Sequence, residues 1–355
     1  MTDIDPTRTL YVGIGQSAPC WYRCALPAMF TGAEWCGVRG NLPNLEFVTG
    51  LSSRALEVDE FFDYDAVVLQ QVRGGAWLSL IRRLQAAGVT VLYEVDDDLH
   101  AVRKHESHMH KARYGKTVLR DTEIAMRASD GVIVSTPFLA QRYRAFNPNI
   151  AVCRNGLDLG RYSLTPVRPA DAVTIGWAGG VGHQEALAPW LKVVARVLQQ
   201  RPHVRFMSVG EPFAQFLERE FGPERAMALP WLEVDTYPAA MSNFDIAIAP
   251  AGRSNFFKAK SDLRWLEAGA LGIPVVADPE VYPEIVDGVT GLHAEDLESV
   301  ERHLLALVDD AALRRRIGEA ARDHVHTQRS MTVMARQWAE AIPALAAAAH
   351  ERSAA

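Results

Sequence analysis

Cysteine is scarce in this sequence. Four cysteines occur among 355 residues and none forms a Cys-x-x-Cys pair; they are Cys20, Cys24, Cys36 and Cys153. Disulfide frameworks are typical of cysteine-rich secreted chains, so a reduced cytoplasmic protein is the simplest interpretation. Cys20, Cys24 and Cys36 with a histidine would provide four zinc ligands, but their spacing differs from that of common structural zinc sites. We therefore expect no metal site.

Long hydrophobic runs are also absent. No uninterrupted apolar stretch reaches the roughly 20 residues that a membrane-spanning helix needs, and the alanine-rich stretch 344–349 is too short. Residues 1–6 are acidic and have no apolar core, which argues against a secretory signal peptide. We expect a cytoplasmic protein without a transmembrane segment.

The sequence has no overall positive charge. Its net charge of −6 argues against a polyanion-binding surface spread over the whole molecule. Residues 103–120 are a local exception, since six basic residues there, among them Arg103, Lys104, Lys111 and Arg113, stand against one acidic residue. Two interpretations stay open for this segment: contact with an anionic acceptor such as DNA, a phosphorylated glycan or a lipid phosphate, or a solvated helix face.

The alternation of apolar segments indicates an α/β fold. At about 150 residues each, 355 residues suffice for two domains. We predict strands at 9–14, 45–48, 65–71, 90–95 and 131–135, and, in the second half, at 173–179, 204–209, 227–229 and 246–250. Helices are predicted between them, followed by tail helices at 297–307, 311–324 and 331–348. Strands that alternate with helices are typical of doubly wound parallel sheets.

Residues 258–291 carry the most informative pattern. Apolar residues recur at helical spacing up to Leu271, Gly272 stands where a helix end favours a left-handed residue, and Pro274 follows. Residues 274–278 then form a short apolar run of the kind that is buried in a parallel sheet. A second short helix is predicted after it. Ligands of open α/β sheets lie beyond the carboxyl ends of the strands, so we expect chemistry here.

Three pieces of this segment resemble a known signature. They are Lys260-Ser261, then Glu267-Ala-Gly-Ala-Leu-Gly272-Ile-Pro274-Val-Val, then Glu284-Ile-Val-Asp-Gly288-Val-Thr-Gly291. Together they resemble the donor-binding signature of GT-B glycosyltransferases, and specifically of the retaining family 4 group. The resemblance runs from about residue 173 to 323. It implies two Rossmann-like doubly wound domains facing a cleft, with a C-terminal helix crossing back to the first domain.

The resemblance also implies domain limits. The acceptor-side domain would span residues 1–165 together with the C-terminal helix at about 331–355, and the donor domain would span 166–330. A nucleoside-diphosphate-sugar, UDP- or GDP-linked, would be the donor substrate. No cofactor would be required, and a metal ion is not expected.

The residues themselves suit such a donor. Lys258, Lys260 and Arg253 provide cationic charge for a pyrophosphate, and helix-start amides near Ser261 bind the same group. Glu267 can accept hydrogen bonds from a ribose diol. The backbone around Tyr282 and Pro283 would close over the phosphates. Taken singly, each of these residues is as well explained by a solvated surface position.

Further donor-side candidates lie at the start of the second half. Gly179 and Gly180 end the strand 173–179, and glycines let a backbone approach a ligand closely. His183 follows and is a candidate for contact with the donor or its sugar. Residues 210–211 and 231–237 are candidates for the surroundings of the base.

One residue departs from the family pattern. Family 4 enzymes carry two glutamates separated by seven residues; the second corresponds to Glu267, whereas the first falls on Ala259. The carboxylate that normally touches the donor sugar is therefore missing or supplied from elsewhere. This departure bears on retention versus inversion of the sugar's configuration and on the identity of the sugar.

Acceptor-side candidates come from the first half. Gly15 lies in a glycine-containing loop after the first strand, and Tyr22-Arg23 precedes a predicted helix. Arg23 would face the cleft and meet a phosphate, or else Tyr22 would be core and Arg23 would snorkel to the surface. Asp96 and Asp97, in the run Asp96-Asp97-Asp98, follow the strand 90–95; one of them would orient the acceptor or act as a base, and a solvated loop is the alternative.

We therefore predict a glycosyltransferase in which Lys258, Lys260, Asp97 and His183 are the catalytic candidates. The acceptor would be a glycan, a lipid-linked glycan or a modified base in DNA. Two other classes stay open: a nucleotide-sugar 2-epimerase or hydrolase of the same fold, and a non-catalytic nucleotide-sugar or nucleic-acid binding protein.

Overall fold

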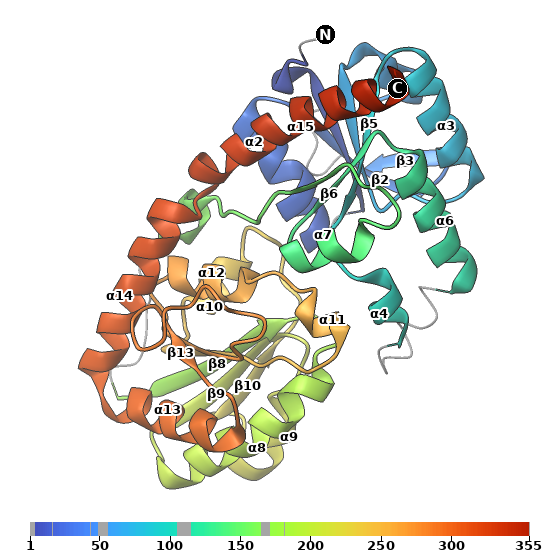
Figure 1. Cartoon of the computed structure of the whole chain (residues 1–355). Coiled ribbons are helices and arrows are strands. Elements are labelled where there is room, and N and C mark those ends of the chain that lie inside the picture. Colours follow the sequence, from blue (N-terminus) through green and yellow to red (C-terminus); the bar gives the residue numbers. More distant parts are fainter. Residues whose placement is uncertain are drawn as a thin grey trace. The chain divides into compact units, whose positions relative to one another are not determined.

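A computed structural model describes residues 4–15, 17–42, 44–48, 56–104, 115–164, 171–180 and 182–354 (Figure 1). The chain divides into two units. The first unit contains Met1–Leu157, Ala259–Ser261 and Met331–Ala355, and the second contains Asp158–Lys258 and Asp262–Ser330. Residues 259–261 thus belong to the first unit although their neighbours on both sides belong to the second.

The first unit is built on a seven-stranded sheet of order β3-β2-β1-β4-β5-β6-β7. Neighbouring strands are parallel except for the antiparallel pair of β2 and β3. The strands are β1 (Thr9–Ile14), β2 (Glu34–Asn41), β3 (Asn44–Val48), β4 (Ala66–Gln70), β5 (Thr90–Val95), β6 (Gly131–Val134) and β7 (Ile150–Val152). Strands β4 and β5 are buried along their whole length, which explains their nearly continuous apolar sequences.

Helices cover this sheet (Figure 1). They are α1 (Ala18–Cys20), the π-helical turn η2 (Trp21–Ala25), α2 (Leu26–Thr31), α3 (Gly75–Ala86), α4 (Leu99–Lys104), α6 (Lys116–Ala128), α7 (Pro137–Tyr143) and α15 (Met331–Ala354). Short 3-10 turns lie at η1 (Pro6–Arg8) and η3 (Val58–Asp63). The hydroxyl of Thr136 caps α7 by accepting a hydrogen bond from the backbone amide of Leu139, with Pro137 at the first position.

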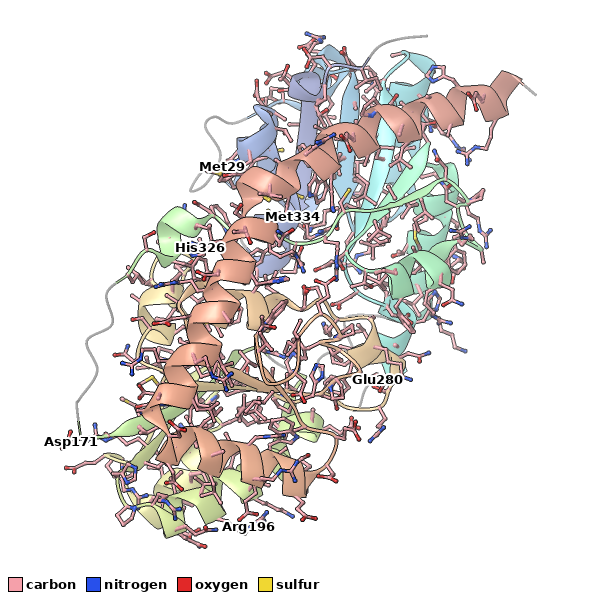
Figure 2. The ribbon with its side chains drawn as sticks, turned by 60° about the vertical axis from the view of Figure 1, so that its left-hand side comes forward. Met29, Asp171, Arg196, Glu280, His326 and Met334 are labelled. Carbon is pink, nitrogen blue, oxygen red and sulfur yellow. The ribbon has the colours of Figure 1, made fainter. Side chains whose placement is uncertain are left out.

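The C-terminal helix α15 packs on this first unit, against α2, β6 and β7. The Trp338 ring on α15 meets the Tyr11 ring edge-on, with 5.8 Å between their centroids. Met334, labelled in Figure 2, lies so close to Gly156 that a Cβ there would come within 2.9 Å of the Met334 side chain. This confirms the C-terminal helix that the GT-B resemblance implied.

The second unit contains a six-stranded parallel sheet of order β10-β9-β8-β11-β12-β13. The strands are β8 (Val173–Gly179), β9 (Val204–Gly210), β10 (Ala226–Leu229), β11 (Ile246–Ala249), β12 (Val275–Ala277) and β13 (Leu292–His293). The helices are α8 (Gln184–Gln200), α9 (Gln215–Phe221), α10 (Tyr237–Met241), α11 (Asn255–Lys258), α12 (Leu263–Ala270), α13 (Leu297–Asp309) and α14 (Ala311–Gln328), with a 3-10 turn η4 (Leu159–Tyr162).

The helix end that the sequence predicted at Gly272 is confirmed. Gly272 has a φ of +68°, and the amide of Ile273 donates to the carbonyl of Ala268 at 2.9 Å. This left-handed closure satisfies the last carbonyls of α12 and turns the chain into β12.

At two places the structure differs from what the sequence predicted. The parallel neighbour of β1 is β2, which the sequence analysis did not identify, and the strand predicted at 45–48 is the antiparallel β3. The second short helix predicted after residues 274–278 is instead a series of turns, in which the amides of Val281 and Tyr282 donate to the carbonyl of Asp278. In both places local apolar spacing was too short to fix the element type.

Across the part of the chain that the structure describes, no helix combines the length and the apolar composition needed to cross a membrane.

The close packing around Gly176, on β8, leads to a prediction about the stability of the protein. A Cβ at Gly176 would lie 2.0 Å from the fully buried ring of Phe244. Gly176→Ala should therefore destabilise the protein by at least about 1–3 kcal/mol, since the core must shift to accept the methyl group. Urea unfolding monitored by tryptophan fluorescence would measure the change.

Gly75→Ala is the matched control, because a Cβ at Gly75 meets nothing within 4 Å and this residue begins α3. Its free energy of unfolding should be equal to or slightly above that of the wild type. An equal loss in both variants would contradict the packing described at β8.

Candidate functional site

The segment that carries the family signature starts at the end of α11. The Nζ of Lys258 forms an ion pair with Glu280 Oε1 at 2.5 Å, and both side chains are about one-third exposed. Glu280, labelled in Figure 2, lies in the loop after β12. Both groups belong to the second unit. Arg253 is exposed in the loop before α11, close enough to Asp278 to lower the pKa of that carboxyl against the stronger, raising effect of burial.

Lys260 lies two residues further on, in the first unit. Its Nζ forms an ion pair with Asp97 Oδ1 at 2.6 Å, and the two side chains are 26% and 23% exposed. The hydroxyl of Ser261 accepts a hydrogen bond from Asn155 Nδ2 at 2.9 Å. The structure thus brings together Lys260, Ser261 and Asp97, which the sequence analysis placed on opposite sides of the site.

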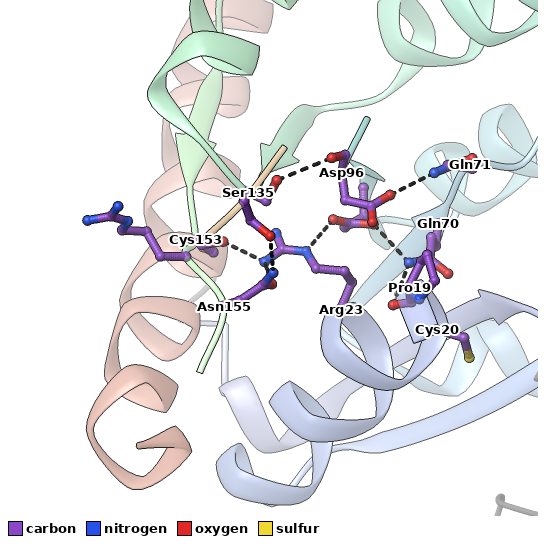
Figure 3. A network of polar contacts seen from close by, with 12 residues as sticks. Pro19, Cys20, Arg23, Gln70, Gln71, Asp96, Ser135, Cys153 and Asn155 are labelled. Carbon is purple, nitrogen blue, oxygen red and sulfur yellow. Dashed lines mark hydrogen bonds and ion pairs between the residues drawn. The ribbon is translucent and has the colours of Figure 1, made fainter. Parts of the chain in front are cut away.

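Asn155, which donates to Ser261, also belongs to a buried polar network (Figure 3). The Nε of Arg23 donates to Glu94 Oε1 at 2.7 Å, and its Nη1 donates to the carbonyl of Cys153 at 2.6 Å and to Asn155 Oδ1 at 2.9 Å. Gln70 Nε2 donates to the other oxygen of Glu94 at 3.1 Å. The guanidinium also stacks over the Trp338 ring at 4.7 Å.

This network corrects the prediction for Arg23. The residue is 1% exposed, so it neither faces a ligand at the surface nor snorkels to water. Tyr22 beside it is also buried, in agreement with the alternative that treated it as core. Gly15 keeps a left-handed φ of +67° after β1, and its amide donates to the carbonyl of Val38 at 2.8 Å.

The three aspartates after β5 have three different environments. Asp96 accepts a hydrogen bond from Gln71 Nε2 at 2.8 Å, and Asp97 holds Lys260. Asp98 is buried, accepts from the amides of His100 and Ala101 at the start of α4, and pairs with Arg142 at 2.9 Å. The run is therefore not a uniformly solvated loop, and Asp98 has a structural role.

Burial changes the acidity of two carboxyls in this region. It raises the pKa of Glu94 to about 7, although the neighbouring Arg23 acts in the opposite direction. Burial and the charge of Asp97 raise the pKa of Asp96 to about 6, while Arg23 and Lys260 lower it. Carboxyls that titrate near neutral pH are the kind that proton-transfer sites use.

In the second unit, the end of β8 is held by a residue that the sequence analysis missed. Arg264, on α12, donates from Nε to the carbonyl of Ala178 at 2.9 Å and lies over the Trp177 ring. A Cβ at Gly179 would come within 2.7 Å of Arg264 Nη2 and 2.9 Å of the Trp177 ring, so a larger residue there would displace these side chains. Its partner, the carbonyl of Ala178, lies 86 residues away, so the local sequence gave no signal for this contact.

Gly180 borders an exposed aromatic side chain. Trp231 is 58% exposed, and a Cβ at Gly180 would lie 3.4 Å from its ring. His183, at the start of α8, is 7% exposed and lies among the rings of Trp177, Phe256 and Phe257, with centroid distances of 5.9–6.2 Å.

Glu267 is buried on α12 rather than exposed. It is 4% accessible, and its Oε2 accepts a hydrogen bond from the hydroxyl of Tyr237 at 3.1 Å. Burial, with the Glu267 charge second, raises the pKa of Tyr237 well above its usual value, so the phenol stays a hydrogen-bond donor.

The predicted phosphate contact at Tyr282 and Pro283 needs correction. Tyr282 is 1% exposed and its amide is bonded to Asp278, while proline has no backbone N–H to donate. These backbone groups therefore do not offer amides to a ligand in this structure.

The start of α12 is anchored by a second buried arginine. Arg329 forms a bidentate pair with Asp262, at 2.6 and 3.0 Å, and its Nη1 also contacts Glu284 at 2.6 Å. Glu284 opens the last piece of the signature. Nothing in the local sequence joined it to Arg329, 45 residues away.

Some predicted residues cannot be placed. Lys111 and Arg113 lie outside the described residues, as do the side chains of Arg103 and Lys104 at the end of α4. Within the described ranges, no three His, Cys, Asp or Glu side chains form a group that could hold a metal ion.

Comparison with solved structures identifies the fold. Sucrose-phosphate synthase from Thermosynechococcus elongatus is 15% identical, with a TM-score of 0.66 over 94% of this chain and 97% of that chain. HepE from Anabaena, solved in complex with UDP and glucose, is 14% identical, with a TM-score of 0.62 over 94% and 98%. A glycosyltransferase from Rickettsia africae ESF-5 is 15% identical, with a TM-score of 0.65 over 94% and 98%.

At these identities the likeness defines the fold, and it confirms GT-B. Residues 190–340 match a family model described as glycosyl transferase-like. The search of curated proteins found no match. The matched domain and the fold together indicate a glycosyltransferase, the class that the sequence predicted.

The raised pKa of Asp96 predicts how the stability of the protein depends on pH. Its pKa rises from 3.8 to about 6 on folding, so the folded state holds a proton that the unfolded chain releases. The free energy of unfolding of the wild type minus that of Asp96→Asn should be largest below about pH 4. It should fall by about 2–3 kcal/mol as the pH rises through 6. Urea unfolding from about pH 2 to 8 would measure this difference and that of its control.

Asp309→Asn provides a control of opposite sign. The Arg201 hydrogen bond lowers the pKa of Asp309, so its stabilising effect should be lost as the pH falls below about 4. A wild-type difference from Asp96→Asn that stays constant across pH 4–8 would contradict the environment described for Asp96.

Proposed function

We propose that this chain transfers a sugar from a nucleoside-diphosphate-sugar, UDP- or GDP-linked, to an acceptor with retention of configuration, as a family 4 enzyme. The family match supports the donor side, because residues 190–340 include Trp231, Arg253, Lys258, Lys260 and the whole of α12. The complex of the similar HepE with UDP and glucose supports a uridine nucleotide.

The observation that carries this proposal is the pair of lysines at residues 258 and 260. Each holds one carboxylate, Glu280 or Asp97, at 2.5–2.6 Å, and each is partly exposed. A pyrophosphate offers the same acceptor chemistry with more charge, so it can replace the carboxylate as the partner of an ammonium group. Stabilisation of the departing diphosphate would then supply most of the rate enhancement.

Other residues take roles around this diphosphate. Ser261 and Arg253 add donors to the phosphates, and the backbone at Gly179 and Gly180 allows a ligand to approach closely. The exposed ring of Trp231 offers a stacking surface for the base. Glu267, polarised by the Tyr237 hydroxyl, would accept from the ribose diol.

On the acceptor side we propose Asp97 and Asp96 as the groups that orient the acceptor, and Gly15, in the segment after β1, as a further acceptor-side residue. A pKa of about 6 suits Asp96 to exchange a proton near neutral pH. His183 is proposed to contact the sugar. A glycan, a lipid-linked glycan or a modified DNA base would be the acceptor, the last favoured by the basic segment 103–120.

Lys260→Ala tests the proposal directly. Loss of the ammonium group should lower turnover by about 10²–10³-fold, because a charge that stabilises the leaving group is removed. Folding should change little, since both partners of the pair are partly exposed. Release of free UDP or GDP from the donor, with and without acceptor, would measure turnover.

Lys192→Ala is the matched control, since this lysine is exposed on α8. Unchanged turnover in Lys260→Ala would overturn the assignment. Diphosphate release that needs no acceptor would instead support the epimerase or hydrolase alternative, and donor binding without release would support a binding protein.

A salt series separates the acceptors. If nucleic acid is the acceptor, its binding should weaken steeply between about 50 and 200 mM salt, because phosphate contacts release counterions. A glycan acceptor should show little dependence on salt. Retention of labelled DNA by the protein, measured at each salt concentration, distinguishes the two.

A further inference from the structure

The side-chain amide of Asn155 lies between a guanidinium and a hydroxyl in the first unit (Figure 3). Its Oδ1 accepts from Arg23 Nη1 and its Nδ2 donates to Ser261 Oγ, each at 2.9 Å. Asn155 is 5% exposed, in the segment after β7. The hydrogen bonds of a buried amide constrain those of its neighbours, because it has a fixed acceptor end and a fixed donor end.

The polarity of this chain of hydrogen bonds is set by Arg23. A guanidinium has donors and no acceptor, and it does not lose its charge in a protein. The oxygen of Asn155 must therefore face Arg23, and its NH₂ group must face Ser261. Arg23 cannot turn away, since it is 1% exposed and is held by Glu94 at 2.7 Å and by the carbonyl of Cys153 at 2.6 Å.

The consequence falls on Ser261. Its oxygen already receives a proton from Asn155, so the hydroxyl proton of Ser261 points away from Asn155 and is available to an outside acceptor. Ser261 is partly exposed and follows Lys260, whose ammonium group is also a donor. Two consecutive side chains thus present donors, a pattern that suits a group rich in acceptor oxygens, such as a phosphate.

We propose that Asn155 is a positioning residue that commits the Ser261 hydroxyl to donate to a phosphate oxygen of the nucleotide donor. The Arg23–Glu94 pair fixes the orientation of Asn155, and Asn155 fixes that of Ser261. This inference rests on the proposed function for the nature of the ligand. The polarity itself follows from the side-chain chemistry of the first unit alone.

Asn155→Asp reverses the polarity and keeps the shape. A carboxylate accepts from Arg23 as the amide oxygen did, so the buried arginine keeps its partner. The second carboxylate oxygen takes the proton of Ser261, so the hydroxyl can no longer donate to a ligand. Ser261→Ala removes the same donor without adding a charge.

The test is titration of UDP and of GDP into the full chain by calorimetry. For the nucleotide that the wild type binds, Asn155→Asp and Ser261→Ala should each weaken affinity by about tenfold, the loss expected for one hydrogen bond to a charged acceptor. The double variant should bind no more weakly than the single ones, since both changes remove one donor. Gln215→Glu, the same change from amide to carboxylate at the exposed start of α9, should leave affinity unchanged.

Several outcomes would overturn the inference. Losses that multiply in the double variant would mean that the new carboxylate acts through its charge and not through Ser261. Wild-type affinity in Ser261→Ala would mean that the hydroxyl donates nothing to the ligand. A wild type that binds neither UDP nor GDP would overturn the proposed function as well, which separates the two failures.

If circular dichroism shows that Asn155→Asp does not fold, Asn155→Ala replaces it in the titration. Without the amide, the hydroxyl of Ser261 is no longer committed to one direction. Asn155→Ala should then weaken affinity by a smaller factor than Ser261→Ala does. When Ser261 is already replaced by alanine, adding Asn155→Ala should not change the affinity further. An equal loss in both backgrounds would contradict the role of Asn155.

Discussion

The ion pair between Arg23 and Glu94 constrains much of the first unit. Both side chains are withdrawn from water, at 1% and 0% exposure, and charges are costly to bury unless every remaining donor and acceptor finds a partner. Gln70 donates to the second oxygen of Glu94, and the carbonyl of Cys153 and Asn155 accept from Arg23 Nη1, whereas Arg23 Nη2 has no hydrogen-bond partner among the described residues. The end of β4 and the segments that follow β1 and β7 are thereby tied to β5, and Asn155 holds Ser261 beside them.

The second unit uses the same chemistry at the start of α12. Arg329 is 4% exposed and holds Asp262 and Glu284, so the beginning of this helix and the turns after β12 are fixed to the end of α14. Arg264, in the first turn of α12, then fixes the end of β8. In each unit a buried arginine therefore orders the backbone beside the residues that we propose to contact the donor.

The fold was largely predictable from the sequence, because strands that are buried in a parallel sheet have nearly continuous apolar sequences. Strands β1, β5 and β8 begin and end where their apolar runs do. Gly272 was recognisable as a helix end because only a residue without a Cβ adopts its φ of +68° at little cost. The strand β2 was not predicted, because its sequence starts with a charged residue and contains two glycines, which makes its apolar pattern weak.

The candidate site was predictable only in part. Motif spacing indicated Lys258, Lys260 and Glu267, since those residues lie within one short segment. Arg264, Arg329 and Asn155 gave no comparable signal, because their partners are far away in the sequence. The same distance explains the error at Arg23, whose buried partner lies 71 residues further on. The error at Tyr282 has a local cause, because a turn takes up its amide.

By itself, then, the sequence determined the alternation of strands and helices, the end of α12 and the lysines that precede it. These features depend on backbone conformation and on the chemistry of neighbouring residues. The tertiary structure alone decided which carboxylate each cation meets: Lys260 pairs with Asp97 across 163 residues, and Arg23 is buried rather than presented to a ligand. Such pairings are set when sheets and helices pack and the cost of burying a charge selects its partner, and no local pattern records that selection.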